Sequence, residues 1–463
     1  MTMAFSLSSC GNAFGENTIW IAFAETGYGR AFLEEWIKEF QEANPDKDYE
    51  FYLEGDPQMT AEIYTRLSTH NEVPDLFFSL DTNWQQWAAR GLLHNLDEVY
   101  GAAVDESGMK MVDFLQENIR DFGKLSDGHY YVVPWSDGVN GLIYNYTMFE
   151  QYGWEVPETV DELMVLIDEI NALDCNHDDN KDNDIAPFAW SGTQANYWDF
   201  VVDNWWAQYE GEQAYNEFFT FEDPITYTQQ GRVEALRVFN DLLVNENTYA
   251  APKNSIEGAM GTTYTLAQTA FIQGKSAMIP NGPWMENEMR EVMPEDFEMR
   301  MMPTPFIEGA KKDENGEYIR INASSAGDFF CIPKEAPNID GAIEFLKFIN
   351  TRASVESYTR VTGAMRPFQY RGSEVEGLNV SNFMRSCLEI YENSTTVYYY
   401  STSPMNWANR LGKWPRIGSP YVAMISGEYL EYKGKEKEQA VTVCQLCCDY
   451  AYDNWWEIYN SVF

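Results

Sequence analysis

Residues 269–289 read Thr-Ala-Phe-Ile-Gln-Gly-Lys-Ser-Ala-Met-Ile-Pro-Asn-Gly-Pro-Trp-Met-Glu-Asn-Glu-Met. This stretch decides the fold, because it predicts a helix end at 269–272, a buried strand at 276–279 and a tight turn at 280–283. Trp284 then begins a new helix. Open α/β sheets bind ligands at turns that follow the carboxyl ends of their strands. A tryptophan there offers a flat apolar face that can stack on a sugar ring; alternatively, Trp284 fills a gap in the core.

The same stretch resembles the hallmark of the extracellular solute-binding proteins of ABC importers, and most closely their maltose-binding-like branch. In that branch an Ala-Phe-x-x-Gly-x-x-Ala-Met strand runs into Asn-Gly-Pro-Trp, and the tryptophan lines the sugar cleft. The resemblance follows most of residues 18–370 in order and includes the patterns at 74–78 and 89–93. It implies that Trp284 contacts a bound sugar.

The first hundred residues alternate between strand and helix patterns. Apolar strands are predicted at 18–23, 49–53 and 75–80, with helices between them. This order predicts an α/β fold with a mostly parallel sheet. The resemblance adds a two-lobed, periplasmic-binding-protein-like fold of type II, in which each lobe has a mostly parallel sheet flanked by helices.

The resemblance also implies hinge crossings near residues 136–138, 303–305 and 351. The expected division is therefore a lipobox and tether at 1–16, an N-terminal lobe of 17–136 plus 303–350, and a C-terminal lobe of 137–302 plus 351–463. A capping box at Thr159 and Glu162 predicts the start of a helix, and Asn315-Gly316 predicts a hairpin turn. The C-terminal remainder is expected to be helical.

Composition narrows the classes of partner. The chain has 463 residues and a net charge of −42, which argues against nucleic acid and anionic lipid surfaces, since both are bound through Lys and Arg. No apolar run is long enough to span a membrane. Aromatic residues make up 15% of the chain, which exceeds what a core of this size needs and suits a carbohydrate cleft.

Polar and aromatic side chains at strand ends, at the hinge and in the second lobe complete the candidate binding site. The resemblance implies a stacking aromatic at Tyr197 or Trp198 and places Arg366 in the loop after the last crossing. For each aromatic the alternative is core packing, and for each carboxylate it is a solvated surface group. The candidates are Glu25, Tyr28, Asp81, Asn83, Trp84, Asp137, Asn140, Tyr197, Trp198, Trp284, Arg366 and Trp407.

The N-terminus contains a candidate lipidation signal. Leu7-Ser8-Ser9-Cys10-Gly11 matches a bacterial lipobox, and we expect the given start to lie inside the signal sequence. The alternative is a chance cysteine in a Ser-rich tail. Lipidation of Cys10 would anchor the protein to the outer face of the cell membrane. The other cysteines do not look like a disulfide framework, and the Cys-x-x-Cys at 444–447 lies in a late helix without a preceding strand or a nearby His. They are therefore expected to be small apolar residues.

An acidic loop at 174–184 is a candidate calcium site. Hard cations take several oxygen ligands, and this loop places Asp or Asn at alternate positions. It departs from the helix–loop–helix calcium pattern, so the alternative is a solvated acidic loop. The candidate ligands are Asp174, Asn176, Asp178, Asn180 and Asp182. No other cofactor is expected.

These features predict a non-enzymatic receptor lipoprotein. It captures an extracellular oligosaccharide by hinge closure and delivers it to the permease subunits of an ABC transporter. We expect a monomer that contacts the membrane only through its lipid anchor. Two alternatives remain open: a surface glycan-degrading enzyme, which would need a pair of carboxylates at the scissile bond, and a sugar-sensing or adhesion lipoprotein of the same fold.

Overall fold

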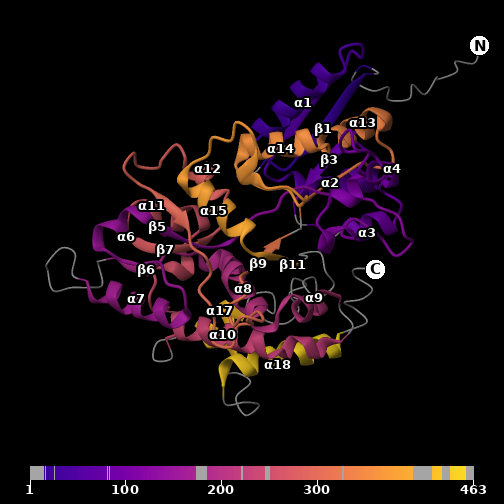
Figure 1. Cartoon of the computed structure of the whole chain (residues 1–463). Coiled ribbons are helices and arrows are strands. Elements are labelled where there is room, and N and C mark those ends of the chain that lie inside the picture. The colour runs from indigo at the N-terminus through magenta and orange to yellow at the C-terminus, as the bar shows by residue number, and fades with distance from the viewer. Residues whose placement is uncertain are drawn as a thin grey trace, which may run out of the picture. The chain divides into compact units, whose positions relative to one another are not determined.

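The computed structural model describes residues 15, 17–25, 27–80, 82, 84–173, 185–220, 223–245, 251–325, 328–399, 420–429 and 438–454 (Figure 1). The chain forms two compact units. Unit 1 consists of Met1–Trp135 and Asp328–Tyr358, and unit 2 consists of Ser136–Gly327 and Thr359–Phe463.

The chain passes between the units at three places, 135/136, 327/328 and 358/359. The first lies next to the hinge predicted near 136–138, but the other two lie further along the chain than expected. Residues 303–325 stay with unit 2 because the strand Ile321–Ser325 (β9) pairs in parallel with Thr395–Tyr399 (β11). The chain was predicted to return to the N-terminal lobe at 303–305, but it returns to unit 1 only at Asp328.

Unit 1 is built on a five-stranded sheet in the order β2-β1-β3-β10-β4. Its strands are β1 (Thr18–Phe23), β2 (Glu50–Gly55), β3 (Leu76–Ser79), β4 (Val133–Pro134) and β10 (Phe329–Cys331). β1 pairs in parallel with β2 and β3, as predicted, whereas β10 runs antiparallel to β3 and β4. The sheet is thus mixed, because β10 belongs to the segment that re-enters unit 1 from unit 2.

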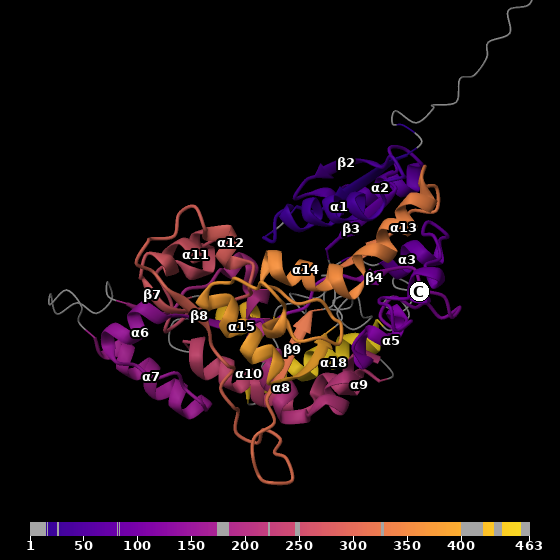
Figure 2. The ribbon, with the colours of Figure 1, turned by 45° about the horizontal axis from the view of Figure 1, so that its top comes forward.

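Helices cover this sheet, and their apolar faces follow the predicted period. Figures 1 and 2 show α1, α2 and α13 beside the strands of unit 1. In α1 the side chains of Phe32, Leu33, Trp36 and Phe40 are buried, and the helix ends before Asn44 as expected. The helices are α1 (Ala31–Ala43), α2 (Met59–Thr69), α3 (Trp84–Ala89), α4 (Asp97–Tyr100), α5 (Met111–Phe114), η1 (Glu117–Ile119), α13 (Ile339–Ile349) and α14 (Arg352–Thr362), whose last turn belongs to unit 2.

Unit 2 has a four-stranded sheet in the order β6-β7-β5-β8 and the β9–β11 ribbon. The four strands are β5 (Gly141–Asn145), β6 (Ala186–Phe188), β7 (Ser276–Asn281) and β8 (Met299–Met301). Only β6 and β7 pair in parallel, while β5 is antiparallel to both β7 and β8. The expectation of a mostly parallel sheet is therefore wrong for this unit.

The helices of unit 2 come from both of its chain segments. They are α6 (Tyr146–Tyr152), α7 (Val160–Ala172), η3 (Gly192–Trp198), α8 (Asp199–Glu210), α9 (Glu212–Thr220), η4 (Pro224–Thr228), α10 (Gln230–Leu243), η5 (Ala259–Gly261), α11 (Tyr264–Ile272), α12 (Met285–Met289), η6 (Gly372–Glu374), α15 (Asn382–Glu392), α17 (Pro420–Ser426) and α18 (Gln439–Asp453). The capping box at Thr159 and Glu162 begins α7, as predicted. Gly316, with φ +88°, makes the predicted turn, which is closed by a bridge between Lys312 and Tyr318.

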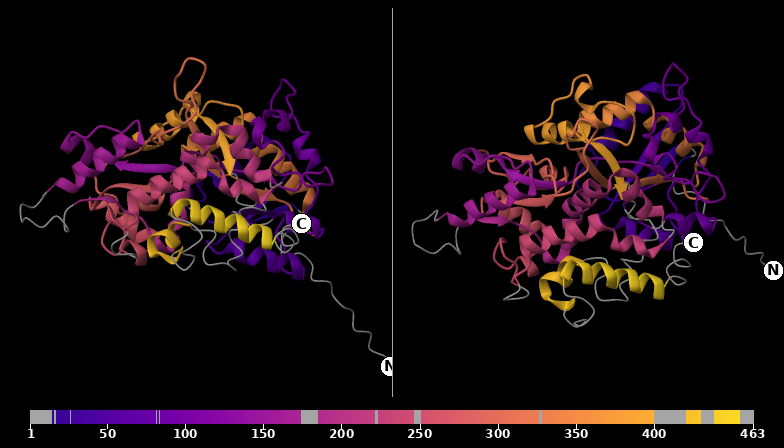
Figure 3. Two further views of the ribbon diagram at one scale, coloured as in Figure 1. Left: turned by 90° about the horizontal axis from the view of Figure 1, so that it is seen from below. Right: turned by 60° about the horizontal axis from the view of Figure 1, so that its bottom comes forward.

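The C-terminal helix α18 is part of the core of unit 2. Figure 3 shows it in yellow alongside α10. Cys444, Cys447 and Cys448 are buried in this contact without disulfides, as Cys331 and Cys387 are elsewhere in the described chain. Burial raises the pKa of the Cys444 thiol to about 12, so it stays protonated. None of the helices in the described part of the chain is long and apolar enough to cross a bilayer.

Candidate functional site

The turn between β7 and α12 brings Trp284 back onto its own backbone. β7 runs through Pro280 to Asn281, two residues beyond the predicted strand end. A Cβ at Gly282 would lie 2.2 Å from the Trp284 ring and 2.7 Å from Asn140 Oδ1. Only glycine therefore lets the indole fold over the turn while Asn140 lies beside it.

Trp284 lies in an aromatic platform, which we define as Trp284, Tyr197 and Phe200. All three side chains are half-buried. The Trp284 ring centroid lies 6.4 Å from that of Tyr197 and 5.5 Å from that of Phe200, and both pairs meet edge to face. Burial, aided by the negative charge of Glu288, raises the pKa of Tyr197 well above its usual range, so its hydroxyl keeps its proton. The platform thus combines partly exposed rings with a neutral hydroxyl.

Asn140 is a buried neighbour of the platform. Asn140 is 5% exposed, and its backbone oxygen accepts a hydrogen bond of 3.2 Å from Asn204 Nδ2 on α8. The same Asn204 side chain accepts a hydrogen bond from the backbone N–H of Ala323 at 2.8 Å. The backbone of residue 140 is thus tied to α8, and a direct contact of Asn140 with ligand stays a prediction.

Trp198 does not belong to the platform. It is fully buried in the core of unit 2, with its ring centroid 5.4 Å from Phe188 and 5.6 Å from Phe239. Tyr197 and Trp198 are consecutive residues at the end of a short, kinked helical segment, so their side chains point in different directions. The prediction that Trp198 is a second stacking surface is corrected, since its ring has no exposed face.

Two further candidates are also buried. Trp84 is 1% exposed and meets the Phe122 ring edge to face. Arg366 is fully buried, with its guanidinium 4.9 Å from the Phe368 ring centroid. Neither side chain therefore offers a surface to a ligand in the structure.

Asp137 is the centre of a buried hydrogen-bond network instead of a free ligand-binding carboxylate. Its Oδ1 accepts from Ser324 Oγ at 2.6 Å and from the Gly138 backbone N–H at 2.8 Å. Its Oδ2 accepts from the hydroxyl groups of Tyr391 and Tyr398. Burial raises the pKa of Asp137, and these donors oppose the increase. Because four protein donors occupy both oxygens, the prediction that Asp137 binds sugar directly is corrected.

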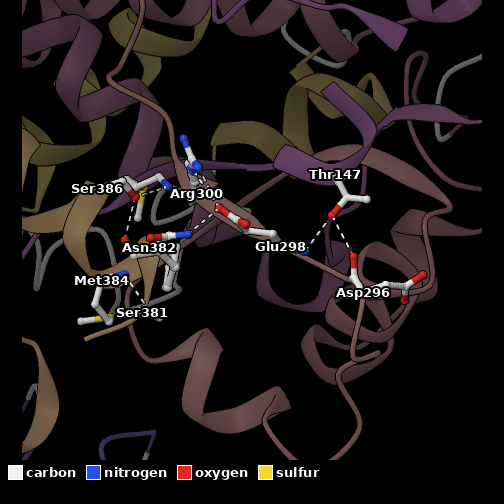
Figure 4. A network of polar contacts seen from close by, with 10 residues as sticks. Thr147, Asp296, Glu298, Arg300, Ser381, Asn382, Met384 and Ser386 are labelled. Carbon is white, nitrogen blue, oxygen red and sulfur yellow. Dashed lines mark hydrogen bonds and ion pairs between the residues drawn. The ribbon is translucent and has the colours of Figure 1, made fainter. Parts of the chain in front are cut away.

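Helix α15, which carries Tyr391, is fastened to the edge strand β8 (Figure 4). Ser386 Oγ accepts a hydrogen bond of 2.9 Å from the Met301 backbone N–H. Asn382 Nδ2 donates to Glu298 Oε1 at 3.1 Å, and Arg300 Nη2 donates to the same oxygen at 2.8 Å. α15 thereby satisfies a backbone donor that the edge strand would otherwise expose.

In unit 1, Glu25 and Tyr28 follow β1 as predicted. Glu25 Oε1 accepts a hydrogen bond from Arg30 Nε at 2.9 Å, and this bond lowers the pKa of Glu25. Tyr28 is half-buried, and its ring centroid lies 5.5 Å from that of Trp135. Their roles in ligand binding stay predictions.

Several predicted residues lie outside the described residues. These are Asp81, Asn83, Trp407, Cys10 and the acidic loop 174–184. Among the residues that the structure does describe, no cluster of His, Cys, Asp and Glu could hold a metal ion. Sequence reasoning missed Phe200, Tyr391 and Tyr398. Phe200 could have been suspected from its place next to the aromatic run 197–198, but the two tyrosines are more than 250 positions from Asp137.

Comparison with known proteins supports this architecture. The family model for bacterial extracellular solute-binding proteins matches residues 24–356. The chain is 25% identical over 343 residues to the multiple sugar-binding protein of Streptococcus mutans, a match that covers 72% of this chain and 71% of the relative. It is 24% identical to the diacetylchitobiose-binding protein NgcE of Streptomyces coelicolor, over 58% of this chain and 52% of the relative.

Solved structures share the fold. The GacH receptor of Streptomyces glaucescens, solved unliganded and with acarbose, superimposes with a TM-score of 0.65 at 18% identity over 94% of this chain and 98% of the receptor. RafE of Streptococcus pneumoniae, in its apo form, superimposes with a TM-score of 0.64 at 17% identity over 95% of this chain and the whole of RafE. At these identities the likeness establishes the two-lobed α/β fold.

Proposed function

The chain belongs to the family of bacterial extracellular solute-binding proteins, and on this basis we propose that it is an oligosaccharide receptor that serves an ABC importer. The observation that carries the proposal is the half-exposed Trp284 platform at the end of β7. Partly exposed aromatic rings can stack on the apolar face of a sugar. A neutral hydroxyl at Tyr197 can donate to a sugar oxygen.

The relatives support a carbohydrate as the ligand class. The multiple sugar-binding protein and the diacetylchitobiose-binding protein are named for sugars, and a further relative from Pyrococcus abyssi is a maltotriose-binding protein. Their ligands span several sugar chemistries, so the proposal commits to oligosaccharides and leaves the linkage to experiment.

The proposed function is binding and not hydrolysis. The matched relatives are binding proteins. A binding protein returns its sugar unchanged, so incubation with oligosaccharides should release no reducing sugar. Release at a rate that scales with protein concentration would support the glycan-degrading alternative.

Three finer parts of the proposal rest on the sequence. Cys10 carries the lipid anchor and places the receptor outside the cell, the acidic loop 174–184 holds a structural calcium ion, and the receptor is a monomer that closes around its hinge when sugar binds. Mass spectrometry of the membrane-extracted protein would detect acyl chains on Cys10. An unmodified N-terminal peptide would contradict the anchor.

A thermal-shift panel tests the ligand class. We would titrate the purified protein with raffinose, maltotriose, diacetylchitobiose and xylotriose, and in parallel with amino acids, a tripeptide and spermidine. A ligand at 100 times its Kd adds about 2.7 kcal/mol of stability, so a bound sugar should raise the Tm clearly. A shift with amino acids, peptide or polyamine and with none of the sugars would overturn the proposal.

A further inference from the structure

Glu288 lies one helical turn after Trp284, on the same side of α12. The Glu288 backbone N–H donates to the Trp284 backbone oxygen at 3.1 Å. Side chains four residues apart on a helix are neighbours, with Cβ atoms about 5–6 Å apart. The side chains of Glu288 and Trp284 therefore start from neighbouring positions on one face of the helix.

One oxygen of the Glu288 carboxylate is bound by Gln268, and the other has no hydrogen-bond partner among the described residues. Gln268, which is fully buried on α11, donates from Nε2 to Glu288 Oε2 at 2.8 Å. Among the described residues, no hydrogen bond reaches Oε1. Glu288 is the exposed residue of α12, although partial burial of its carboxyl group raises its pKa. The Gln268 bond reduces the freedom of the carboxylate before any ligand arrives, which lowers the entropic cost of binding.

The hydroxyl of Tyr197 belongs to the same neighbourhood. The negative charge of Glu288 contributes to the raised pKa of Tyr197, and the Tyr197 ring meets Trp284 edge to face. A sugar ring stacked on Trp284 would thus have a carboxylate acceptor and a phenol donor at the edge of its stacking surface. Sugar hydroxyls can donate to the first and accept from the second.

We propose that Glu288 is a further sugar-binding residue, whose Oε1 accepts hydrogen bonds from the hydroxyl groups of the sugar unit stacked on Trp284. This inference rests on the proposed function. It also narrows the substrate class, because a carboxylate at this position repels an acidic sugar. The subsite therefore takes a neutral or amino sugar and rejects a uronic acid.

Glu286 provides a matched control on the same helix. Its carboxylate accepts a hydrogen bond from Ser381, at the start of α15 in the network of Figure 4. Glu286 and Glu288 are two positions apart on a helix and so do not share a face. Glu286→Gln makes the same chemical change as Glu288→Gln without touching the platform.

The experiment measures Kd by tryptophan fluorescence for maltotriose, raffinose, diacetylchitobiose and trigalacturonic acid. For each neutral or amino sugar that the wild type binds, Glu288→Gln should weaken affinity about 10- to 100-fold, since hydrogen bonds to charged groups have effects of this size. Glu286→Gln should stay within about twofold of the wild type. Glu288→Gln should also reduce the ratio of the Kd for trigalacturonic acid to the Kd for the neutral sugars.

The outcomes separate this inference from the proposed function. If the wild type binds no sugar, the proposed function fails and the inference fails with it. If the wild type binds sugar and Glu288→Gln binds it equally well, the inference alone is overturned. If Glu288→Gln does not fold, Glu288→Asp serves as the test variant. It keeps the negative charge but moves the carboxylate back by one methylene group. A sugar Kd equal to that of the wild type in Glu288→Asp would also overturn the inference.

Discussion

The Tyr398 hydroxyl donates a hydrogen bond of 2.7 Å to Asp137 Oδ2, although the two residues lie 261 positions apart. Asp137 comes directly after the first passage into unit 2, and Ser324, which donates to its other oxygen, lies shortly before the second. The Asp137 backbone N–H also donates to Met365, a few residues after the third. Asp137 therefore fastens together the segments by which the chain enters and leaves unit 2.

Replacing Asp137 by Asn should lower stability more than it lowers sugar affinity. The amide cannot accept from all four donors, and each buried donor left without a partner costs about 1–3 kcal/mol. Tyr398→Phe removes one donor and should cost less. Urea unfolding measures the loss and fluorescence titration measures Kd. A variant of wild-type stability with weakened sugar binding would restore Asp137 as a direct ligand contact.

His129 should titrate above its ordinary value. Its Nδ1 lies 2.6 Å from Asp97 Oδ2, and this hydrogen bond raises the pKa of His129 above 6.5. The bond favours the protonated imidazole in the folded state, so its stabilising effect is complete below pH 6.5 and is lost as pH rises through the folded pKa. NMR of the imidazole protons measures this pKa, and Asp97→Asn should return it toward 6.5. A wild-type pKa at or below 6.5 would show that the pair does not form in solution.

Local patterns predicted the elements of this fold well. The strand at 18–23, the helix with Phe32 and Trp36 on its apolar face, and the capping box at Thr159 all lie where the sequence places them. Each depends on side chains close together in the chain, where hydrophobic period and hydrogen-bonding groups can be read directly. Trp284 at the start of α12 was predicted in the same way.

Long-range pairing could not be predicted in this way. The antiparallel direction of β10 and the pairing of β9 with β11 depend on where the chain recrosses between the units, and no local pattern encodes that. Trp198 and Tyr197 are adjacent in sequence, yet one is core and the other half-exposed. Consecutive side chains of a helix point in different directions, and the apolar pattern does not show which of these two faces the core.

Chelator should lower the Tm if the acidic loop at 174–184 binds calcium. An ion bound only by the folded state at 100 times its Kd adds about 2.7 kcal/mol of stability, which EGTA would remove and added calcium restore. Asp178→Ala should abolish this response and leave sugar affinity nearly unchanged. Asp46→Ala, at an exposed acid in unit 1, is the control and should respond like the wild type. A Tm that does not change on addition of EGTA at low ionic strength would mean that the acidic loop binds no calcium.

Gly282→Ala should displace the Trp284 ring. The new methyl group would lie 2.2 Å from that ring, so the indole has to move from the turn. We expect sugar affinity to fall about tenfold and stability to fall by about 1–3 kcal/mol, the usual cost of overpacking. Gly261→Ala is the matched control, because a Cβ there meets no atom within 4 Å. Equal sugar affinity in both variants would mean that the position of the indole does not matter for binding.

Trp284 and Trp198 should respond in opposite ways to replacement by alanine. Trp284 is half-buried, and aromatic stacking on a ring of this kind is worth about 1–3 kcal/mol, so Trp284→Ala should weaken sugar binding about 10- to 100-fold with a modest loss of stability. Trp198 is fully buried in the core of unit 2, and its removal should cost about 3–5 kcal/mol of folding free energy. Under conditions where it remains folded, Trp198→Ala should keep its Kd near that of the wild type. Urea unfolding and fluorescence titration on the same samples separate the two effects. If Trp284→Ala unfolds the protein, or if it binds sugar as tightly as the wild type, then Trp284 is a core residue and the platform is not the sugar site.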